Sequence, residues 1–265
     1  MSGTLYGKEC RGMWKLLAIF CGVLALYSVA VVAMFDPELG NALAEFEKVM
    51  PGMMAAMGMT SFGTELVEFL ASYLYGMLFT VFPLVFIVLT ANRLVVRYVD
   101  SGAMALLLAT PTSRRTIVTT QAAVLLTGVL ALLAVTGGVL QGTAEALFPG
   151  KLDLAAFWTL NGGLACFHLA LCGWCFFISC VCNEVRRAVA LGAGVPVLGF
   201  LLQMLANLGG GLERLKYLTP WSLFSPRAIL AGEGWVPAGL AALAAAGVVL
   251  LGLGIWRFCR RDLPL

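Results

Sequence analysis

The residues with the greatest potential for chemistry lie close together in one apolar stretch. Cys172, Gly173, Trp174 and Cys175 form a Cys-x-x-Cys sequence, and His168, the only histidine of the chain, lies four residues before it. On a helix these thiols and the imidazole share one face, which makes a metal or thiol site geometrically possible. A redox Cys-x-x-Cys needs an exposed thiol of low pKa at a helix start, and an apolar stretch disfavours a thiolate. We therefore interpret these residues as packing residues and expect no bound metal.

A second group of soft ligands is a methionine cluster nearer the start of the chain. Its members are Met50, Met53, Met54, Met57 and Met59. Thioethers suit Cu(I), but methionine also fills irregular apolar gaps. We interpret the cluster as the apolar face of a helix that lies at a membrane surface.

Motifs for hydrolytic chemistry are absent from the sequence. Gly7-Lys8 and Gly150-Lys151 lack the upstream glycine and the hydroxyl residue of a phosphate-binding loop. The sequence also has no Gly-x-Ser-x-Gly turn and no His-Glu-x-x-His helix. We expect a protein that is not an enzyme, without catalytic residues and without a cofactor of its own.

The composition indicates whether this chain is a soluble or a membrane protein. Of its 265 residues, 61% are hydrophobic and 12% are charged, and the mean hydropathy is +0.95. Soluble domains carry about 25% charged residues, and a soluble fold of this size could not bury so much apolar surface. The composition predicts an all-α integral membrane protein.

Six stretches are long and apolar enough to cross a bilayer as helices. They comprise residues 16–34, 71–91, 116–141, 155–181, 188–208 and 237–257. We expect them to form a single transmembrane domain over residues 1–265. Pro196 lies inside the fifth stretch and predicts a kink there.

Positive charges predict the orientation of the six spans. With the N-terminus inside, the inner segments hold 12 of the 17 lysines and arginines, and the outer segments hold 10 of the 14 acidic residues. Cytoplasmic segments are normally enriched in lysine and arginine. We therefore expect both the N- and the C-terminus to be cytoplasmic.

Two outer connections carry enough apolar residues to lie on the membrane. Residues 35–70 predict two short interfacial helices separated at Pro51. Residues 209–236 begin with three glycines and contain Pro220 and Pro226, so they predict a re-entrant or interfacial hairpin before the sixth span.

Polar residues inside the spans are uncharged. They are Gln121, Gln141, Asn161, His168, Gln203 and Asn207. A proton- or sodium-coupled carrier would usually place a carboxylate there. Interhelical hydrogen bonding is the expected role of these residues.

The inner connection over residues 92–115 is the most informative segment. Asp100 or Ser101 can cap a short helix, and Met104, Leu107 and Leu108 give that helix an apolar side. Pro111 ends it, and Ser113 can cap the next helix. The pattern predicts a short cytoplasmic helix between two turns, although composition alone also allows a simple basic connector.

This segment resembles the cytoplasmic segment of ABC type 2 exporter permeases, which precedes their third span. The matching residues are Asp100, Gly102, Leu107, Leu108, Ala109, Pro111, Ser113 and Arg114. Weaker likenesses extend over most of the chain, at Phe62-Gly63, at Leu218-Thr219-Pro220 and at Arg261-Asp262-Leu263-Pro264. The chain departs from the family pattern at Ala103 and Gln121, where threonine and lysine are frequent.

The resemblance implies a permease subunit of an ATP-driven exporter in a bacterial cell (plasma) membrane. Two permease subunits, as a homo- or heterodimer, would form the pathway, and separate ABC ATPase subunits would supply ATP and Mg²⁺. The residues that would couple to the ATPase are Asp100, Gly102, Leu107, Leu108, Pro111, Ser113 and Arg114. The N-terminal segment with Lys8 and Glu9 would lie beside them, and no nucleic-acid partner is expected.

The alternative function is a secondary transporter without an ATPase. Such carriers have broken spans in matching positions of two halves. Pro196 and the Pro220 hairpin both lie in the C-terminal half, which favours the exporter. The transported substrate does not follow from the sequence.

Overall fold

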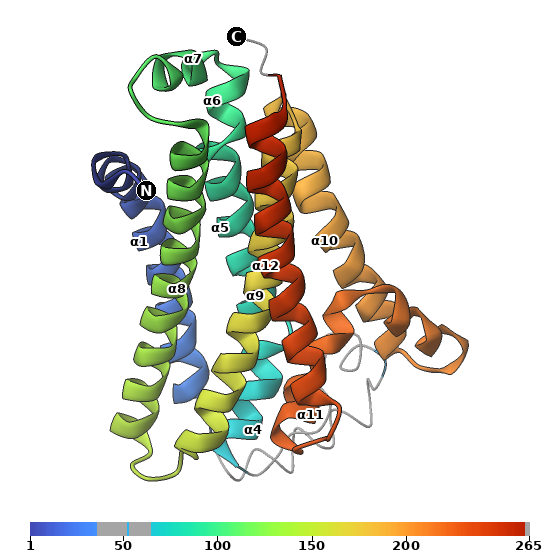
Figure 1. Cartoon of the computed structure of the whole chain (residues 1–265). Helices are drawn as coiled ribbons and strands as arrows, with labels where there is room; N and C mark the ends of the chain where they lie inside the picture. Colours follow the sequence, from blue (N-terminus) through green and yellow to red (C-terminus); the bar gives the residue numbers. More distant parts are fainter. Residues whose placement is uncertain (36–51, 53–64, 263–265) are drawn as a thin grey trace.

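The computed structural model describes residues 1–35, 52 and 65–262, and it confirms six helices that are long and apolar enough to cross a membrane (Figure 1). They are α1 (Gly3–Ala33), α5 (Leu78–Leu94) with its continuation α6 (Val96–Asp100), α8 (Arg114–Leu147), α9 (Leu154–Val181), α10 (Val185–Asn207) and α12 (Val236–Arg260). All regular elements of the described residues are helical, as the composition predicts.

Shorter elements connect these helices. α4 (Leu66–Leu70) and the π-helix η1 (Ala71–Tyr75) precede α5, and α7 (Ala103–Leu108) lies between α6 and α8. Two 3₁₀-helices, η2 (Gly210–Leu218) and η3 (Pro220–Leu223), and the short helix α11 (Pro226–Leu230) lie between α10 and α12. η2 projects from the side of the bundle (Figure 1).

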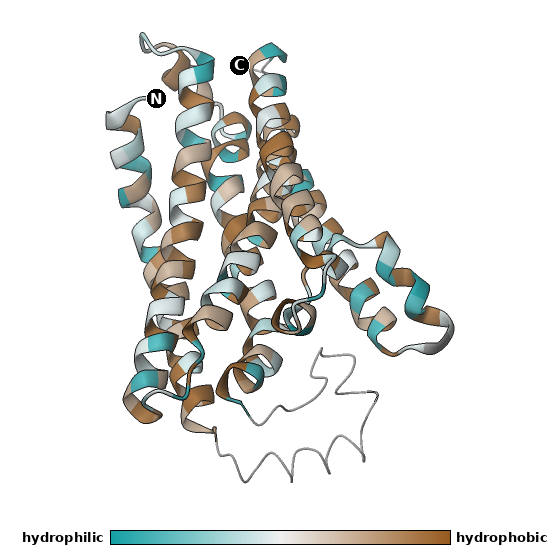
Figure 2. Ribbon diagram, turned by 60° about the horizontal axis from the view of Figure 1, so that its bottom comes forward, coloured by the Kyte–Doolittle hydropathy of each residue, from teal (hydrophilic) through white to brown (hydrophobic). Residues whose placement is uncertain are grey.

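The connections gather at two ends of the bundle. The start of α1, the end of α12 and the α6–α7 segment lie at one end, which we call the terminal end (Figure 1), and Figure 2 shows the start of α1 and the end of α12 at the same end of the bundle. α4, α11 and the α8–α9 connection lie at the other end, which we call the loop end (Figure 1). Segments expected on one side of the membrane therefore share one end of the molecule.

α9 is the central helix of the bundle. It packs along α12 over most of its length and also contacts α5, α8 and α10, while α1 packs along α8. At the α9–α12 crossing, a Cβ on Gly173 would lie 2.5 Å from the carbonyl oxygen of Gly247. Small residues at such a crossing let two membrane helices approach backbone to backbone.

Polar residues begin several of the helices. Ser113 Oγ accepts from the Thr116 amide at 3.1 Å at the start of α8, as the sequence predicts. Asp153 accepts from the Ala155 and Ala156 amides at the start of α9. These side chains satisfy amides that have no partner within their own helix.

The predicted boundaries differ most for the first three spans. α1 begins at Gly3, 13 residues before the predicted start, because charged residues continue the same helix. The second span was predicted from residue 71, but residues 71–75 form the π-helix and α5 begins at Leu78. α8 has 34 residues, about 50 Å of helix against an apolar bilayer core of about 30 Å.

The two spans with a proline in their interior continue as helices past it. Pro196 lies inside α10 and Pro83 inside α5. The interruption of the N-terminal half is the π-helix, for which the sequence has no local signal. Residues 209–236 contain η2, η3 and α11. Of the residues 35–70 predicted to form interfacial helices, 36–51 and 53–64 lie outside the described residues, as does the whole methionine cluster, and α4 lies in the described remainder.

Candidate functional site

The α6–α7 segment turns sharply at Gly102. Its φ is +72°, a left-handed conformation that glycine adopts without a steric penalty. Gly102 is also the N-cap of α7, and no side chain caps this helix. The prediction that Asp100 or Ser101 caps it is wrong, because Ser101 Oγ instead donates to the Arg97 carbonyl at 2.7 Å.

α7 has one buried side and one exposed side. Met104 is fully buried, and Leu107 and Leu108 are half-buried against the core, as predicted. Leu106 is 76% exposed, and nothing in the sequence distinguishes it from the leucines beside it. α7 is therefore held against the bundle by one side and presents Leu106 on the other.

Asp100 connects this segment to the start of α10. Its Oδ2 accepts a hydrogen bond from the Val185 amide at 3.3 Å. A carboxylate at a helix N-terminus also interacts favourably with the helix dipole. A movement of α6 would therefore reach α10 directly.

Arg114 connects the start of α8 to the ends of two other helices. Its guanidinium donates to the Arg261 carbonyl at 3.0 Å. The Arg261 guanidinium, in turn, donates to the carbonyls of Val181 at 2.9 Å and Cys182 at 3.0 Å, where α9 ends. Arg261 is only 6% exposed, and burial lowers the pKa of its guanidinium. We call Arg114 and Arg261 the arginine clamp.

The N-terminal part of α1 packs against the same region. Glu9 is 2% exposed, and its Oε1 accepts from the Tyr98 hydroxyl at 2.6 Å. The Lys8 Nζ lies 5.9 Å from the centre of the Tyr98 ring, and Arg93 donates to the Gly12 carbonyl. The N-terminal segment therefore lies beside α6, in agreement with the prediction.

The seven predicted coupling residues all lie between α6 and the first turn of α8, at the terminal end. Asp100, Ser113 and Arg114 bond to helix ends, whereas Gly102 and Pro111 are exposed. Their role toward a partner stays a prediction.

The Cys172–Cys175 pair and His168 lie in the packed interior. All three are buried, and Cys175 Sγ donates to the Gly192 carbonyl of α10 at 3.4 Å. His168 Nδ1 lies 2.8 Å from the Leu164 carbonyl one turn earlier. These are the contacts of packing residues.

Hydrogen bonding between helices is expected of the polar residues inside the spans, and three of them also have hydrogen bonds within their own helix. Asn161, His168 and Gln203 bond within their own helices. Interhelical bonding joins Ser179 Oγ of α9 to Asn92 Oδ1 of α5 at 3.2 Å. Neither residue was predicted, because each lies near the end of an apolar stretch among many similar residues.

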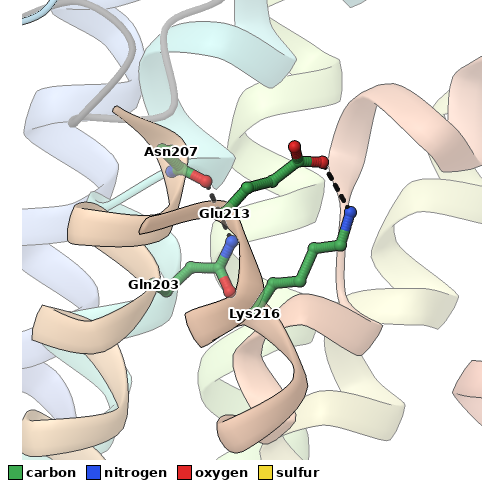
Figure 3. Close-up of polar contacts among 4 residues, drawn as sticks. All are labelled: Gln203, Asn207, Glu213 and Lys216. Atoms are coloured by element: carbon green, nitrogen blue, oxygen red, sulfur yellow. Dashed lines mark hydrogen bonds and ion pairs between the residues drawn. The ribbon is translucent and has the colours of Figure 1, made fainter. Parts of the chain in front are cut away.

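A cavity of about 450 Å³ opens at the loop end, where no motif in the sequence predicts one. η1 and the start of α5 form one side, the last turns of α10 the second, and η3 and α11 the third. A carboxamide pair lies on the α10 side, where Gln203 Nε2 donates to Asn207 Oδ1 at 2.9 Å (Figure 3).

Near this pair, η2 carries an exposed ion pair. Lys216 Nζ lies 2.8 Å from Glu213 Oε1 (Figure 3). The hydrogen bond and the opposite charge lower the pKa of Glu213 and raise the pKa of Lys216. Exposed pairs of this kind contribute little to stability.

Comparison with known proteins identifies one family over nearly the whole chain. A family model described as "ABC-2 family transporter protein" matches residues 8–263. Neither the curated proteins nor the solved structures give a match.

Proposed function

Because this chain belongs to the ABC-2 family of transporter proteins, we propose that it works as the permease of an ATP-driven exporter whose ATPase binds α7. Family membership and the six apolar helices make it a multi-pass membrane component of a transporter. The family match covers a membrane transport domain, and we assign ATP hydrolysis to a separate subunit.

The exposed Leu106 supports α7 as the docking site, because α7 is connected to several spans. α7 follows α6 without a long linker, and the arginine clamp lies at the start of the next span. Through Asp100 the same segment bonds to α10. A movement of α7 would therefore be transmitted to α5, α8 and α10. The arginine clamp would transmit it further to α9 and α12.

The proposal places the terminal end in the cytoplasm. The inner segments hold 12 of the 17 lysines and arginines, and a cytoplasmic excess of these residues is the usual pattern. An ATPase in the cytoplasm could then reach α7. A second permease subunit would complete the pathway, and the family match favours this arrangement over a secondary carrier.

Co-purification from the native host tests the proposal. The tagged chain, extracted in mild detergent, should bring down a subunit that mass spectrometry identifies by a phosphate-binding loop sequence. Replacing the exposed Arg115 by glutamate should weaken this association, and the matched change Arg227→Glu at the loop end should leave it intact. Purification without any ATPase, or equal binding by both variants, would contradict the proposal.

A further inference from the structure

A groove lies between the start of α8 and the end of α12, two neighbouring helices that both reach the terminal end (Figure 1). Arg115 and Thr119 contribute to its lining from α8, and the last turns of α12 contribute the rest. Its volume of about 500 Å³ falls within the range of small-molecule sites, about 300–1,000 Å³. We call it the α8–α12 groove.

Two arginines, one from each helix, supply the charge of this groove. Arg115 and Arg260 are both exposed, and neither forms an ion pair with a carboxylate of the described residues. The Arg260 guanidinium lies 4.8 Å from the centre of the Trp256 ring, a cation–π contact that leaves its N–H donors for an anion. Thr119 donates its hydroxyl proton to the Arg115 carbonyl at 2.7 Å, and Cys259 carries a free thiol. With no acidic residue in the lining, the two guanidiniums suit a phosphate group.

The groove becomes apolar along α12, away from the terminal end. Ile255 and Trp256 lie about one turn before Arg260, and Gly252 lies about two turns before it, so the lining extends for about 12 Å at 1.5 Å per residue. Trp256 is 52% exposed, and its indole N–H has no partner among the described residues. A Cβ on Gly252 would meet no atom within 4 Å, so this part of the groove is open. A ligand that fills the groove is therefore anionic at one end and apolar at the other.

The surroundings of the groove favour a lipid over a water-soluble anion. Val249 and Leu253, on the same face of α12 as Trp256, are 58% and 45% exposed, so the apolar surface continues beyond the groove along the span. A free phosphate would contact the arginines and leave this surface uncovered. Tryptophan is enriched where spans meet the membrane–water interface, and basic pockets between spans bind anionic headgroups.

A second copy of the chain offers little negative charge to the same groove. The segments expected on this side of the membrane hold four acidic residues. Glu9, Asp100 and Glu184 already bond to groups of their own chain, at 2.6, 3.3 and 3.1 Å. Asp262 is the remaining one, and it is exposed. Charge complementarity therefore favours an anionic lipid over a second copy.

We propose that the α8–α12 groove binds an anionic phospholipid. Its phosphate contacts Arg115 and Arg260, and its glycerol and acyl part lies against Trp256 and beside Gly252. The lipid thereby joins the start of α8 to the end of α12, the same two helices that the arginine clamp connects through the main chain of Arg261. The inference requires a membrane but no ATPase.

Native mass spectrometry of the full chain tests the charged part of the groove. The delipidated protein in detergent would be titrated with dioleoylphosphatidylglycerol and with dioleoylphosphatidylcholine, and the first phosphatidylglycerol should bind at least tenfold more tightly. Arg115→Gln and Arg260→Gln should each weaken phosphatidylglycerol binding about fivefold, as expected for one arginine beside an anionic lipid, and leave phosphatidylcholine binding unchanged. Arg186→Gln makes the same replacement at the exposed second residue of α10, outside the groove, and should change neither.

Two glycine variants test the apolar part without changing any charge. Gly252→Phe fills the groove and should weaken phosphatidylglycerol binding at least fivefold. Gly138→Phe on α8, outside the groove, should leave it unchanged. A Cβ at either position meets open space, so both variants should fold, and an unaltered size-exclusion elution checks this for every variant. An excess of inorganic phosphate should not displace the lipid.

Four outcomes would overturn the inference. Two are equal affinity of the unaltered chain for the two lipids and unaltered phosphatidylglycerol affinity in the glutamine variants of Arg115 and Arg260. Displacement of the lipid by inorganic phosphate would identify a simple anion site. A dimer of the chain that excludes the lipid and dissociates in Arg260→Gln would identify an interface between copies. Because Arg115 also lies near the proposed ATPase site, the sample contains no ATPase, and failure here would leave ATP-driven export standing.

Discussion

Arg114 donates a hydrogen bond to the main-chain carbonyl of Arg261 across 147 positions of sequence. The Arg261 guanidinium in turn donates hydrogen bonds to the carbonyls of Val181 and Cys182 at the end of α9. The start of α8 and the ends of α9 and α12 are thus joined at the terminal end by one arginine clamp, with α7 a few residues away.

Replacing Arg261 should destabilise the bundle. Arg261→Met removes two charge-assisted hydrogen bonds to Val181 and Cys182, each contributing about 1.5–3 kcal/mol in typical cases, partly offset by the lost cost of burying a guanidinium. We expect a loss of about 2 kcal/mol in the free energy of unfolding, measured by thermal denaturation in detergent. The exposed neighbour Arg257, changed to Met, is the control. Equal melting temperatures for the two variants would show that the clamp contributes nothing.

The α9–α12 crossing should not accept a side chain. Gly173→Ala places a Cβ 2.5 Å from the Gly247 carbonyl oxygen, and such overpacking typically costs about 1–3 kcal/mol. Gly162→Ala on the same helix meets open space and should be neutral or slightly stabilising, since alanine favours helix over glycine. Melting temperatures in detergent compare the two. A Gly173→Ala protein as stable as Gly162→Ala would contradict the close approach.

Loss of the Glu9–Tyr98 hydrogen bond should destabilise the protein more than loss of an exposed hydrogen bond. Tyr98→Phe leaves a nearly buried carboxylate without its 2.6 Å donor, and such a loss costs about 1–3 kcal/mol. Tyr6→Phe removes an exposed hydroxyl bond to Thr127 and should cost much less. Comparable stabilities of the two phenylalanine variants would argue against a structural role for Glu9.

The sequence predicts the six spans because apolar length is a strong signal, and it predicts α7 because Pro111 and Ser113 mark clear boundaries. The start of α1 is missed because charges such as Glu9 normally end a span, and only tertiary contact with Tyr98 explains its burial. The bond from Asp100 to Val185 depends on which helices become neighbours. The loop-end cavity depends on a π-helix for which residues 71–75 carry no local signal.

The Glu213–Lys216 ion pair lies outside the spans, and its strength should depend on pH. Because Lys216 lowers the pKa of Glu213, the pair's interaction is complete above the ordinary glutamate pKa and is lost as the pH falls through the lowered value. Lys216→Met should raise the pKa of Glu213 toward its ordinary value. An NMR titration of ¹³C-labelled glutamate side chains measures this shift. An unchanged pKa in the variant would mean that the pair does not form in solution.

If an ATPase binds α7 at Leu106, two exposed leucines on different connections of the molecule should differ in their effect on ATPase binding. Leu106 is 76% exposed on α7, and Leu218 is 71% exposed on η2. The measurement is the amount of ATPase subunit that co-purifies with Leu106→Glu and with Leu218→Glu from the native host. We expect Leu106→Glu to lose at least nine tenths of the co-purified ATPase and Leu218→Glu to keep it. Full retention of the ATPase by Leu106→Glu, or its loss from Leu218→Glu alone, would contradict binding of the ATPase at Leu106.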